Sequence, residues 1–291
     1  MIQFQMVIKM QLTALIYSVE DESFFTITLD GKKTYFYLQK HLAKKFNKYL
    51  RKGTYVTIDF SDKQVLCKKI LAYKVNHFIE VSYPRKKYNK EVYYNLETIR
   101  EGIKEIVSNI NPIMFIDFEM NMQDYKPILN FEQEIIEAGM VLTNKDGSIM
   151  DFKHWYIKPT KFPKITNRAM KFLRYTPQTL KNAISFKSFY NELKAINEKY
   201  HPSVLVWGKS DITQLKKCFS INNCPDLNLH FIDLLQLHRN YDNLKESPGL
   251  FAMWEAYNNS SLPKQMHDSL EDAMVTKDVF FKFKEKILSR G

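Results

Sequence analysis

The sequence is poor in cysteine, glycine and proline, and it has no long apolar run. Its 291 residues include 3 Cys, 8 Gly and 10 Pro, which argues against a disulfide framework and against long disordered tracts. Because Cys67, Cys218 and Cys224 are odd in number and lack Cys-x-x-Cys spacing, we expect buried or free thiols in a reducing cytoplasm. No apolar stretch reaches the roughly 18 residues of a membrane span, and the first residues lack the basic-then-apolar order of a signal peptide.

Charge is plentiful but unevenly placed along the chain. There are 43 Lys and Arg against 32 Asp and Glu, and residues 1–110 alone hold 19 basic and 11 acidic side chains. A front part with a net charge of +8 favours a polyanionic partner, and nucleic acid is the commonest such partner. A lysine-rich protein with solvated lysines throughout is the competing interpretation. The length and the apolar content of 45% predict one or two globular domains.

Residues 1–83 are predicted to form a small β-barrel. Alternating patterns and turn residues predict strands over residues 6–18, 23–29, 33–38, 54–60 and 65–82, with a helix over residues 40–50. Asp30-Gly31 is a hairpin signal, and Gly53 is expected to end the helical region. Three strands, a helix and two more strands is the order of an OB-fold. The stretch Lys52–Phe60 also resembles the fourth strand of OB and cold-shock-like domains, although the glycine-flanked aromatic signatures of cold-shock proteins are missing.

A barrel of this kind binds single strands by stacking bases on exposed aromatic rings inside a basic groove. Phe25, Tyr35 and Tyr37 are the candidate rings. The lysines nearby in sequence are Lys32, Lys33, Lys44, Lys45 and Lys48. Because side chains alternate between the faces of a strand, Phe36 and Leu38 should point away from Tyr35 and Tyr37. For each ring a place in the barrel core is the competing interpretation, and docking of a protein is the competing role of the barrel.

A basic stretch is predicted to separate the barrel from a larger second domain. Residues 84–95 are interpreted as a linker, and residues 96–291 as the second domain. The domain would open with an amphipathic helix whose apolar positions are Leu96, Ile99, Ile103, Ile106 and Ile110. Strands are predicted over residues 113–120, 134–142, 152–159, 203–207 and 228–235, and helices over residues 185–196, 212–219 and 267–288. Three antiparallel strands followed by alternating helices and strands predict an α/β domain with an RNase H-like mixed sheet.

Two carboxylates follow an apolar run in the stretch Ile113–Met120. The run predicts a buried strand, and Asp117 and Glu119, two residues apart, would project from the same face of it. Paired carboxylates on a buried strand repel each other and are costly to desolvate, so a divalent cation between them is a stable arrangement. Oxygen ligands of this kind suit Mg²⁺ or Mn²⁺. A strand end that reaches solvent, with both acids hydrated, is the competing interpretation.

Further acids and a histidine fall where an RNase H-like sheet would gather them. Asp211 opens the helix after the fourth strand, and Asp272 lies on the last helix, five residues after His267. Each has a structural alternative, as an N-cap for Asp211, a polar helix start for His267 and a surface acid for Asp272. Of the remaining acids, we expect Glu134 and Glu137 to be fold or rim acids and Asp233 to be structural. Surface positions are expected for Asp268 and Glu271.

Three motifs occur in order in the second domain. The first is Phe115-Ile-Asp-Phe-Glu119 followed by Glu134-Ile-Ile-Glu-Ala-Gly139, the second is Val206-Trp-Gly-Lys-Ser-Asp211, and the third is His267-Asp-Ser-Leu-Glu-Asp272. With these motifs, roughly residues 111–288 resemble the DEDDh branch of the DnaQ-like 3′→5′ exonucleases. The stretch Ile157-Lys-Pro-Thr looks closest to the small RNA-trimming and KapD-like members. The chain departs from the pattern at Arg174-Tyr-Thr-Pro177, where relatives usually have a Leu-Thr-Gly-Ile turn.

The resemblance implies a role for each matching residue. The ligands of two Mg²⁺ or Mn²⁺ ions would be Asp117, Glu119, Asp211 and Asp272. His267 would be the general base for the attacking water, and Met120 would touch the terminal nucleotide. The implied activity is a metal-dependent 3′→5′ exoribonuclease that releases nucleoside 5′-monophosphates from single-stranded RNA or 3′ overhangs. An exodeoxyribonuclease of DNA repair or proofreading and a non-catalytic nucleic-acid-binding module are the competing functions.

Overall fold

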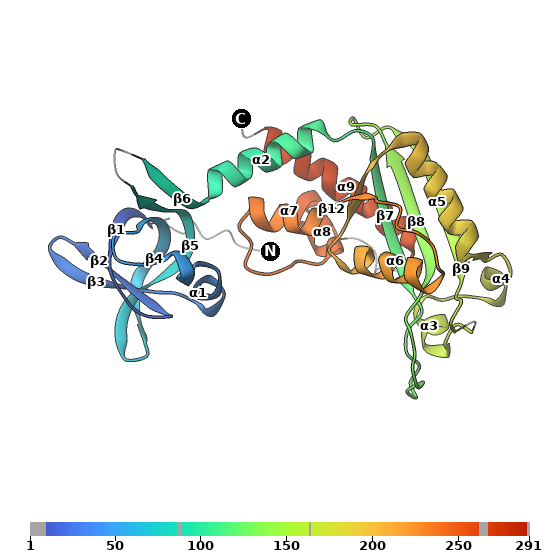
Figure 1. Ribbon diagram of the computed structural model, residues 1–291, viewed down its shortest axis with the longest axis horizontal. Helices are drawn as coiled ribbons and strands as arrows, with labels where there is room; N and C mark the ends of the chain where they lie inside the picture. The colour runs from blue at the N-terminus through green and yellow to red at the C-terminus, as the bar shows by residue number, and fades with distance from the viewer. Residues whose placement is uncertain (1–9, 86–88, 163, 262–266, 290–291) are drawn as a thin grey trace. The chain divides into compact units, whose positions relative to one another are not determined.

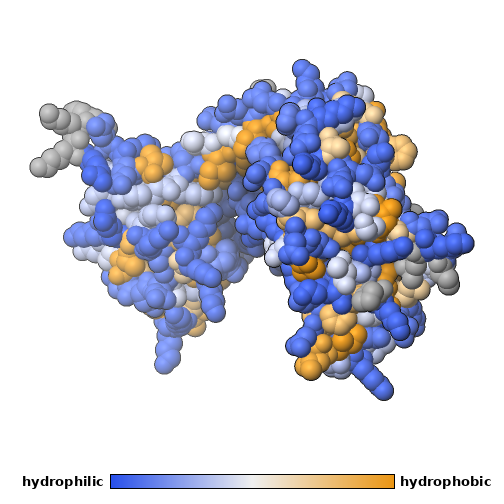
Figure 2. All heavy atoms as spheres, turned by 45° about the vertical axis from the view of Figure 1, so that its right-hand side comes forward, coloured by the Kyte–Doolittle hydropathy of each residue, from blue (hydrophilic) through white to orange (hydrophobic). Residues whose placement is uncertain are grey.

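The computed structural model describes residues 10–85, 89–162, 164–261 and 267–289, so the predicted strand residues 6–9 lie outside the described part. The chain divides into two compact units between Gly102 and Ile103 (Figure 1). Within the described residues no helix is both long and apolar enough to span a bilayer. All three cysteines are free thiols. The face of the molecule in Figure 2 is mostly hydrophilic, with apolar side chains in small separate patches.

The first unit is a closed five-stranded barrel. Its elements are β1 (Met10–Asp21), β2 (Phe24–Leu29), β3 (Lys32–Tyr37), α1 (Lys40–Phe46), the 3₁₀ helix η1 (Asn47–Tyr49), β4 (Tyr55–Cys67) and β5 (Ile70–Pro84). The strand order is β3-β2-β1-β4-β5, and a parallel pairing of β3 with β5 closes the ring. This connectivity is that of an OB-fold, so the predicted OB-like barrel is confirmed.

Two turns of the barrel differ from the sequence-based expectation. Residues 65–67 belong to β4, because the turn into β5 falls at Lys68 and Lys69, which adopt positive φ values of 47° and 69°. Without a glycine or asparagine there, the sequence did not indicate a turn. Gly53, with φ of 83°, lies in the turn into β4, where its N–H donates to the carbonyl of Ile16, and not at a helix end.

The predicted linker over residues 84–95 is wrong for most of its described part. Residues Lys90–Asn95 form β6, which pairs antiparallel with the end of β5 and so belongs to the first unit's sheet. The division between the units instead falls inside α2 (Leu96–Asn109). Of the predicted apolar positions Leu96, Ile103 and Ile110 are buried, whereas Ile106 is 43% exposed and Val107 is buried in its place.

Aromatic side chains fill the interior of the barrel. Phe25 is fully buried and stacks on Phe36, with the ring centroids 5.5 Å apart, and it also lies beside Phe78. Phe25 is therefore a core residue, and its prediction as an exposed platform for bases is wrong. Tyr35 and Tyr37 are half-exposed on the opposite face of β3 from the buried Phe36, as the strand alternation predicted.

The second unit is built on a six-stranded mixed sheet. Its strands are β7 (Ile113–Met120), β8 (Ile135–Thr143), β9 (Ile149–Lys158), β10 (Ile184–Ser185), β11 (Ser203–Val206) and β12 (His230–Asp233). Its helices are α3 (Asn167–Phe172), α4 (Pro177–Lys181), α5 (Phe186–Tyr200), α6 (Ser210–Ile221), α7 (Leu234–Tyr241), α8 (Leu250–Asn258) and α9 (Ser269–Leu288). The order β10-β9-β8-β7-β11-β12, with β7 to β9 antiparallel and β11 and β12 parallel to β7, confirms the RNase H-like sheet. Helix α8 was not predicted.

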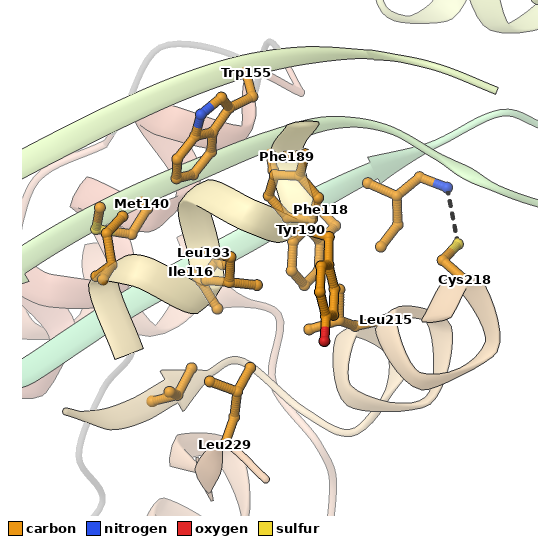
Figure 3. Close-up of a cluster of buried hydrophobic side chains, with 14 of the residues drawn as sticks. Ile116, Phe118, Met140, Trp155, Phe189, Tyr190, Leu193, Leu215, Cys218 and Leu229 are labelled. Atoms are coloured by element: carbon orange, nitrogen blue, oxygen red, sulfur yellow. Dashed lines mark hydrogen bonds between the residues drawn. The ribbon is translucent and has the colours of Figure 1, made fainter. Parts of the chain in front are cut away.

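The two faces of β7 are covered by different helices. Its even-numbered residues enter an apolar cluster with α5 and α6, in which Ile116 and Phe118 lie near Phe189 (Figure 3). The odd-numbered face packs on α9, because the Phe115 ring lies 5.6 Å from that of Phe280. Figure 1 shows α5 and α9 on opposite sides of the sheet. Asp117 and Glu119 continue the odd-numbered face and therefore point toward α9.

The burial of Phe25 predicts a large difference between two aromatic substitutions in the barrel. Phe25→Ala leaves a cavity in the core and should lower the free energy of unfolding by about 3–5 kcal/mol. Tyr35→Ala removes a half-exposed ring and should cost about 1 kcal/mol or less. Urea unfolding of the full chain, followed by circular dichroism, measures both. Equal small losses for the two variants would contradict the placement of Phe25.

Candidate active site

The carboxyl ends of two parallel strands bring three acids to one edge of the sheet. Asp117 and Glu119 lie in the second half of β7, and Asp211 lies in the first turn of α6, which follows β11. β11 pairs in parallel with β7, with Leu205 opposite Phe115, so both strands run toward the same edge. The predicted grouping of these acids is therefore what the sheet topology produces.

Helix capping does not account for Asp211. Lys209 is the N-cap of α6, and Asp211 is the second residue of the helix, with 5% of its surface exposed. Burial of a carboxylate at this position is costly unless its charge is balanced. Asp211 is therefore placed by a requirement other than the start of the helix.

The N-terminal end of α9 completes the cluster. Asp272 is 4% exposed in the first turn of α9, and His267 lies just before the helix. His267 Nδ1 is 3.7 Å from Glu119 Oε1. One ligand atom from each of Glu119, His267 and Asp272 fits within 4.8 Å of the others, a spacing that could hold a metal ion. The five predicted side chains thus meet at one edge of the sheet.

The carboxylates strongly disfavour one another's charge. Burial raises the pKa of Glu119 to about 8 and that of Asp211 to about 7, and in both cases the charge of Asp272 adds to the effect. Burial also raises the pKa of Asp117 well above its usual range, and the charges of Asp211, Asp272 and Glu119 raise it further. Such a set of hard oxygen ligands fits a divalent cation, which would compete with protons for the same oxygens.

His267 is held in an unusual backbone conformation beside an exposed aromatic ring. Its φ is 54°, in the left-handed region that non-glycine residues adopt rarely. Its imidazole lies against Phe172 of α3, with ring centroids 4.3 Å apart. Partial burial lowers the pKa of His267 below its ordinary value, which keeps the ring neutral and able to accept a proton near pH 7.

Glu137 connects the cluster to its surroundings, and sequence analysis treated it only as a structural or rim acid. It lies opposite Glu119 in the β7–β8 pairing and is 2% exposed. Its Oε1 accepts hydrogen bonds from Ser269 N–H and Oγ–H, both 2.9 Å, and contacts His154 Nε2 at 2.8 Å. Because Ser269 is the first residue of α9, Glu137 fixes the helix end that carries His267 and Asp272. A glutamate within an apolar strand was the available signal.

Gly139 allows α9 to approach β8 closely. Gly139 lies opposite Asp117, and a Cβ at this position would clash with backbone atoms of Ser269 and Leu270. The two residues of β8 that face the β7 carboxylates, Glu137 and Gly139, therefore both contact the start of α9. The first and third motifs are held in register by direct packing.

The departure at Arg174-Tyr-Thr-Pro177 contributes to the same network. The Tyr175 hydroxyl donates a hydrogen bond to Glu137 Oε2, and the Tyr175 ring packs edge-on against Tyr156. Arg174 adopts a positive φ of 56°. The altered turn thus supplies a further donor to the carboxylate that anchors α9.

The other acids and Met120 have separate places. Asp233 caps α7 by accepting from Gln236 N–H, and Asp268 caps α9 by accepting from Glu271 N–H, so both are structural. Glu134 is buried and accepts three backbone N–H groups of Thr160, Lys161 and Phe162. Met120 is half-buried at the end of β7, and its contact with a nucleotide stays a prediction.

An RNase H-like sheet with a buried acidic cluster and a histidine at its edge defines a metal-dependent nuclease. The family model for exonucleases, described as RNase_T, matches residues 114–280, which is more than half of the chain. The chain therefore belongs to the exonuclease family and is a 3′→5′ exonuclease, and members of its DEDDh branch depend on a divalent metal.

This chain covers most of the length of each of the similar proteins. The probable 3′-5′ exonuclease KapD of Bacillus subtilis (strain 168) is 31% identical over 173 residues, which cover 58% of this chain and 83% of that protein. The nuclease domain of 3′hExo, a DEDDh family member bound to rAMP, has a TM-score of 0.53 at 21% identity and covers 63% of this chain and 94% of that one. A 3′-exonuclease that recognises the histone mRNA stem-loop has a TM-score of 0.52 at 16% identity, covering 68% and 81%. The two structures support the fold.

The raised pKa values predict how stability changes with pH in metal-free protein. A carboxyl whose pKa is raised by folding contributes stability at low pH that is lost as the pH rises through the folded value. With ordinary carboxyl pKa values of 3.8 and 4.5 in the unfolded chain and folded values of about 7 and about 8, the melting temperature should fall between about pH 4 and about pH 8. Added Mn²⁺ should reduce this fall, and Asp117→Asn should weaken both effects. Thermal unfolding scans across this pH range, with and without Mn²⁺, measure both effects. A melting temperature of the metal-free protein that rises with pH would contradict the crowding of these acids.

Glu137 and Glu134 form a matched pair for testing how α9 is placed. Both are 2% exposed and accept backbone N–H groups, but only Glu137 binds the start of α9. Glu137→Ala should lower kcat about 10–100-fold through displacement of His267 and Asp272, whereas Glu134→Ala should mainly lower the melting temperature. Glu137→Gln, which can still accept the Ser269 N–H, should recover part of kcat. Equal losses of kcat in the two alanine variants would show that Glu137 contributes only stability.

Proposed function

We propose that this protein removes nucleotides from the 3′ end of single-stranded RNA, or of 3′ overhangs, and releases nucleoside 5′-monophosphates. One observation carries the proposal. Side chains from three separate segments, at residues 117–119, 211 and 267–272, meet at one edge of the sheet with mutually raised carboxyl pKa values. A structural role for these acids would not require them to be crowded in this way.

Each residue of the cluster has a chemical role in the proposal. The ligands of two Mg²⁺ or Mn²⁺ ions are Asp117, Glu119, Asp211 and Asp272. When bound, such a pair of cations supplies charge neutralisation at the scissile phosphate and activation of the attacking water. His267 accepts the proton of that water at its imidazole, which partial burial keeps neutral. Phe172 packs against the His267 ring, and Glu137 fixes Ser269 two residues further along the chain.

RNA is the proposed substrate, and DNA is the alternative. Among proteins of similar fold, one nuclease domain is bound to rAMP and another protein recognises a histone mRNA stem-loop. The basic barrel supports a single-stranded polyanion as the partner, with the first unit holding the strand and the second unit cutting it. We also propose a cytoplasmic location, consistent with three free thiols. An exodeoxyribonuclease of repair or proofreading would use the same metal site.

The experiment compares two aspartate-to-asparagine variants on labelled RNA and DNA oligomers with Mg²⁺ or Mn²⁺. Asp117→Asn removes a proposed ligand and should reduce release of 5′-mononucleotides about a thousand-fold or more. Asp233→Asn keeps an N-capping oxygen at α7 and should retain most activity, because this residue lies outside the cluster. Faster hydrolysis of RNA than of DNA supports the RNA assignment. Undiminished release by Asp117→Asn would overturn the proposed site, and faster hydrolysis of DNA would overturn the proposed substrate.

A further inference from the structure

An unusual number of apolar side chains is exposed on one outer face of the barrel. The outward residues of β1 include Leu15 and Tyr17, which are 44% and 52% exposed. Tyr55 of β4 is 42% exposed and pairs with Leu15 across the strands, so its ring extends the same surface. Monomeric proteins seldom leave contiguous apolar surface uncovered without a partner. We refer to the outward side chains of β1, β4 and β5 on this side as the β1–β4–β5 face.

At the border of this face, two basic side chains of the turn into β4 contact tyrosine rings, and of these Tyr17 faces outward whereas Tyr83 points to the other side of β5 from Ser82. The Arg51 guanidinium lies 4.1 Å from the centre of the Tyr83 ring and also donates to the Tyr93 hydroxyl at 3.3 Å. Lys52 Nζ lies 5.7 Å from the Tyr17 ring. Cation–ring contacts hold these long side chains at fixed positions while their remaining N–H groups can bind an anion. The border therefore combines ordered cations with aromatic surface.

A groove of about 470 Å³ continues the face on the other side of Tyr55. Its lining includes the hydroxyl-bearing Thr13, Thr57 and Ser82, the basic Arg85 and Lys90, and the acidic Glu80. These two cations are ion-paired with Glu91 and Glu80, respectively. A groove of this volume, with hydroxyl and ammonium donors beside an exposed ring, suits a planar base with its sugar-phosphate.

We propose that single-stranded nucleic acid lies across the β1–β4–β5 face, with bases stacked on Tyr17 and Tyr55 and phosphates bound by Arg51 and Lys52. This inference rests on the proposed function, because it assigns the surface by which the barrel holds the substrate strand. The excess of basic residues favours nucleic acid over an uncharged partner, since residues 1–110 carry 19 basic and 11 acidic side chains. The β2–β3 side offers less ring surface, because Phe24 and Phe25 are buried there and Tyr35 and Tyr37 are less exposed than Tyr17 and Tyr55.

The test measures binding without cleavage, in full-length protein carrying Asp117→Asn. Fluorescence anisotropy with a labelled single-stranded RNA of about 20 nucleotides is recorded at several salt concentrations. Tyr17→Ala with Tyr55→Ala should weaken binding about tenfold or more, because each lost ring removes a stacking partner. Arg51→Ala should weaken binding. It should also reduce the magnitude of the slope of log binding constant against log salt concentration by about one. Thermal scans of each variant confirm that the barrel remains folded.

Matched variants distinguish RNA binding at this face from binding at the β2–β3 side and from contact with a second copy of the chain. Leu66 and Leu71 are an exposed cross-strand pair at the tip of the β4–β5 hairpin, and truncating both to alanine should leave RNA affinity within about twofold. A loss of affinity in Tyr35→Ala with Tyr37→Ala, but not in Tyr17→Ala with Tyr55→Ala, would overturn the assignment in favour of the β2–β3 side.

A second copy of the chain is the other possible occupant of this face. Unchanged RNA affinity of Tyr17→Ala with Tyr55→Ala, together with loss of a dimer in sedimentation, would show that a second copy covers it. Because binding is measured without hydrolysis, the two proposals can fail separately. If the unmodified chain bound RNA but released no nucleotide, the proposed function would be contradicted and this inference would stand.

Discussion

The electrostatic repulsion among buried carboxylates at one edge of the sheet is the constraint on which the second unit depends. Burial raises the pKa values of Asp117, Glu119 and Asp211, and the charge of Asp272 raises each of them further. A fold would not retain four such groups for stability alone, because removing one of them relieves the repulsion. The arrangement is explained when a divalent cation replaces the protons that the cluster otherwise binds.

The rest of the unit serves to hold that cluster together. The even-numbered face of β7 is fixed by the apolar cluster under α5 and α6, which leaves the odd-numbered face to carry the acids. On β8, Glu137 binds the first residue of α9 and Gly139 lets the helix approach, so the third motif is positioned from the strand that pairs with the first motif. Phe172 then packs on the His267 ring. The geometry of the cluster follows from strand register and one helix end.

Much of this was predictable from the sequence, and the failures have physical causes. An apolar run ending in Asp117 and Glu119 identified the central strand, and motif order identified the RNase H-like sheet. The role of Glu137 was not predicted because a single sequence does not show which buried acid finds donors across the sheet. Phe25 was misplaced because both faces of a small barrel's strands carry aromatic residues, and only closure of the barrel decides which face is inside. The β6 strand was taken for a linker because lysines at a sheet edge have the same composition as a solvated loop.

The central claim is that the four carboxylates exchange protons for divalent cations. Calorimetric titration of Mn²⁺ into the full chain near pH 7.5, repeated in two buffers of different ionisation enthalpy, measures both metal binding and proton release. The account predicts saturable binding accompanied by proton release, since Glu119 and Asp211 have pKa values of about 8 and about 7 without metal. Asp117→Asn should bind much more weakly, and Asp233→Asn should bind as the unmodified chain does. Absence of Mn²⁺ binding, or equal binding by Asp117→Asn, would contradict the account.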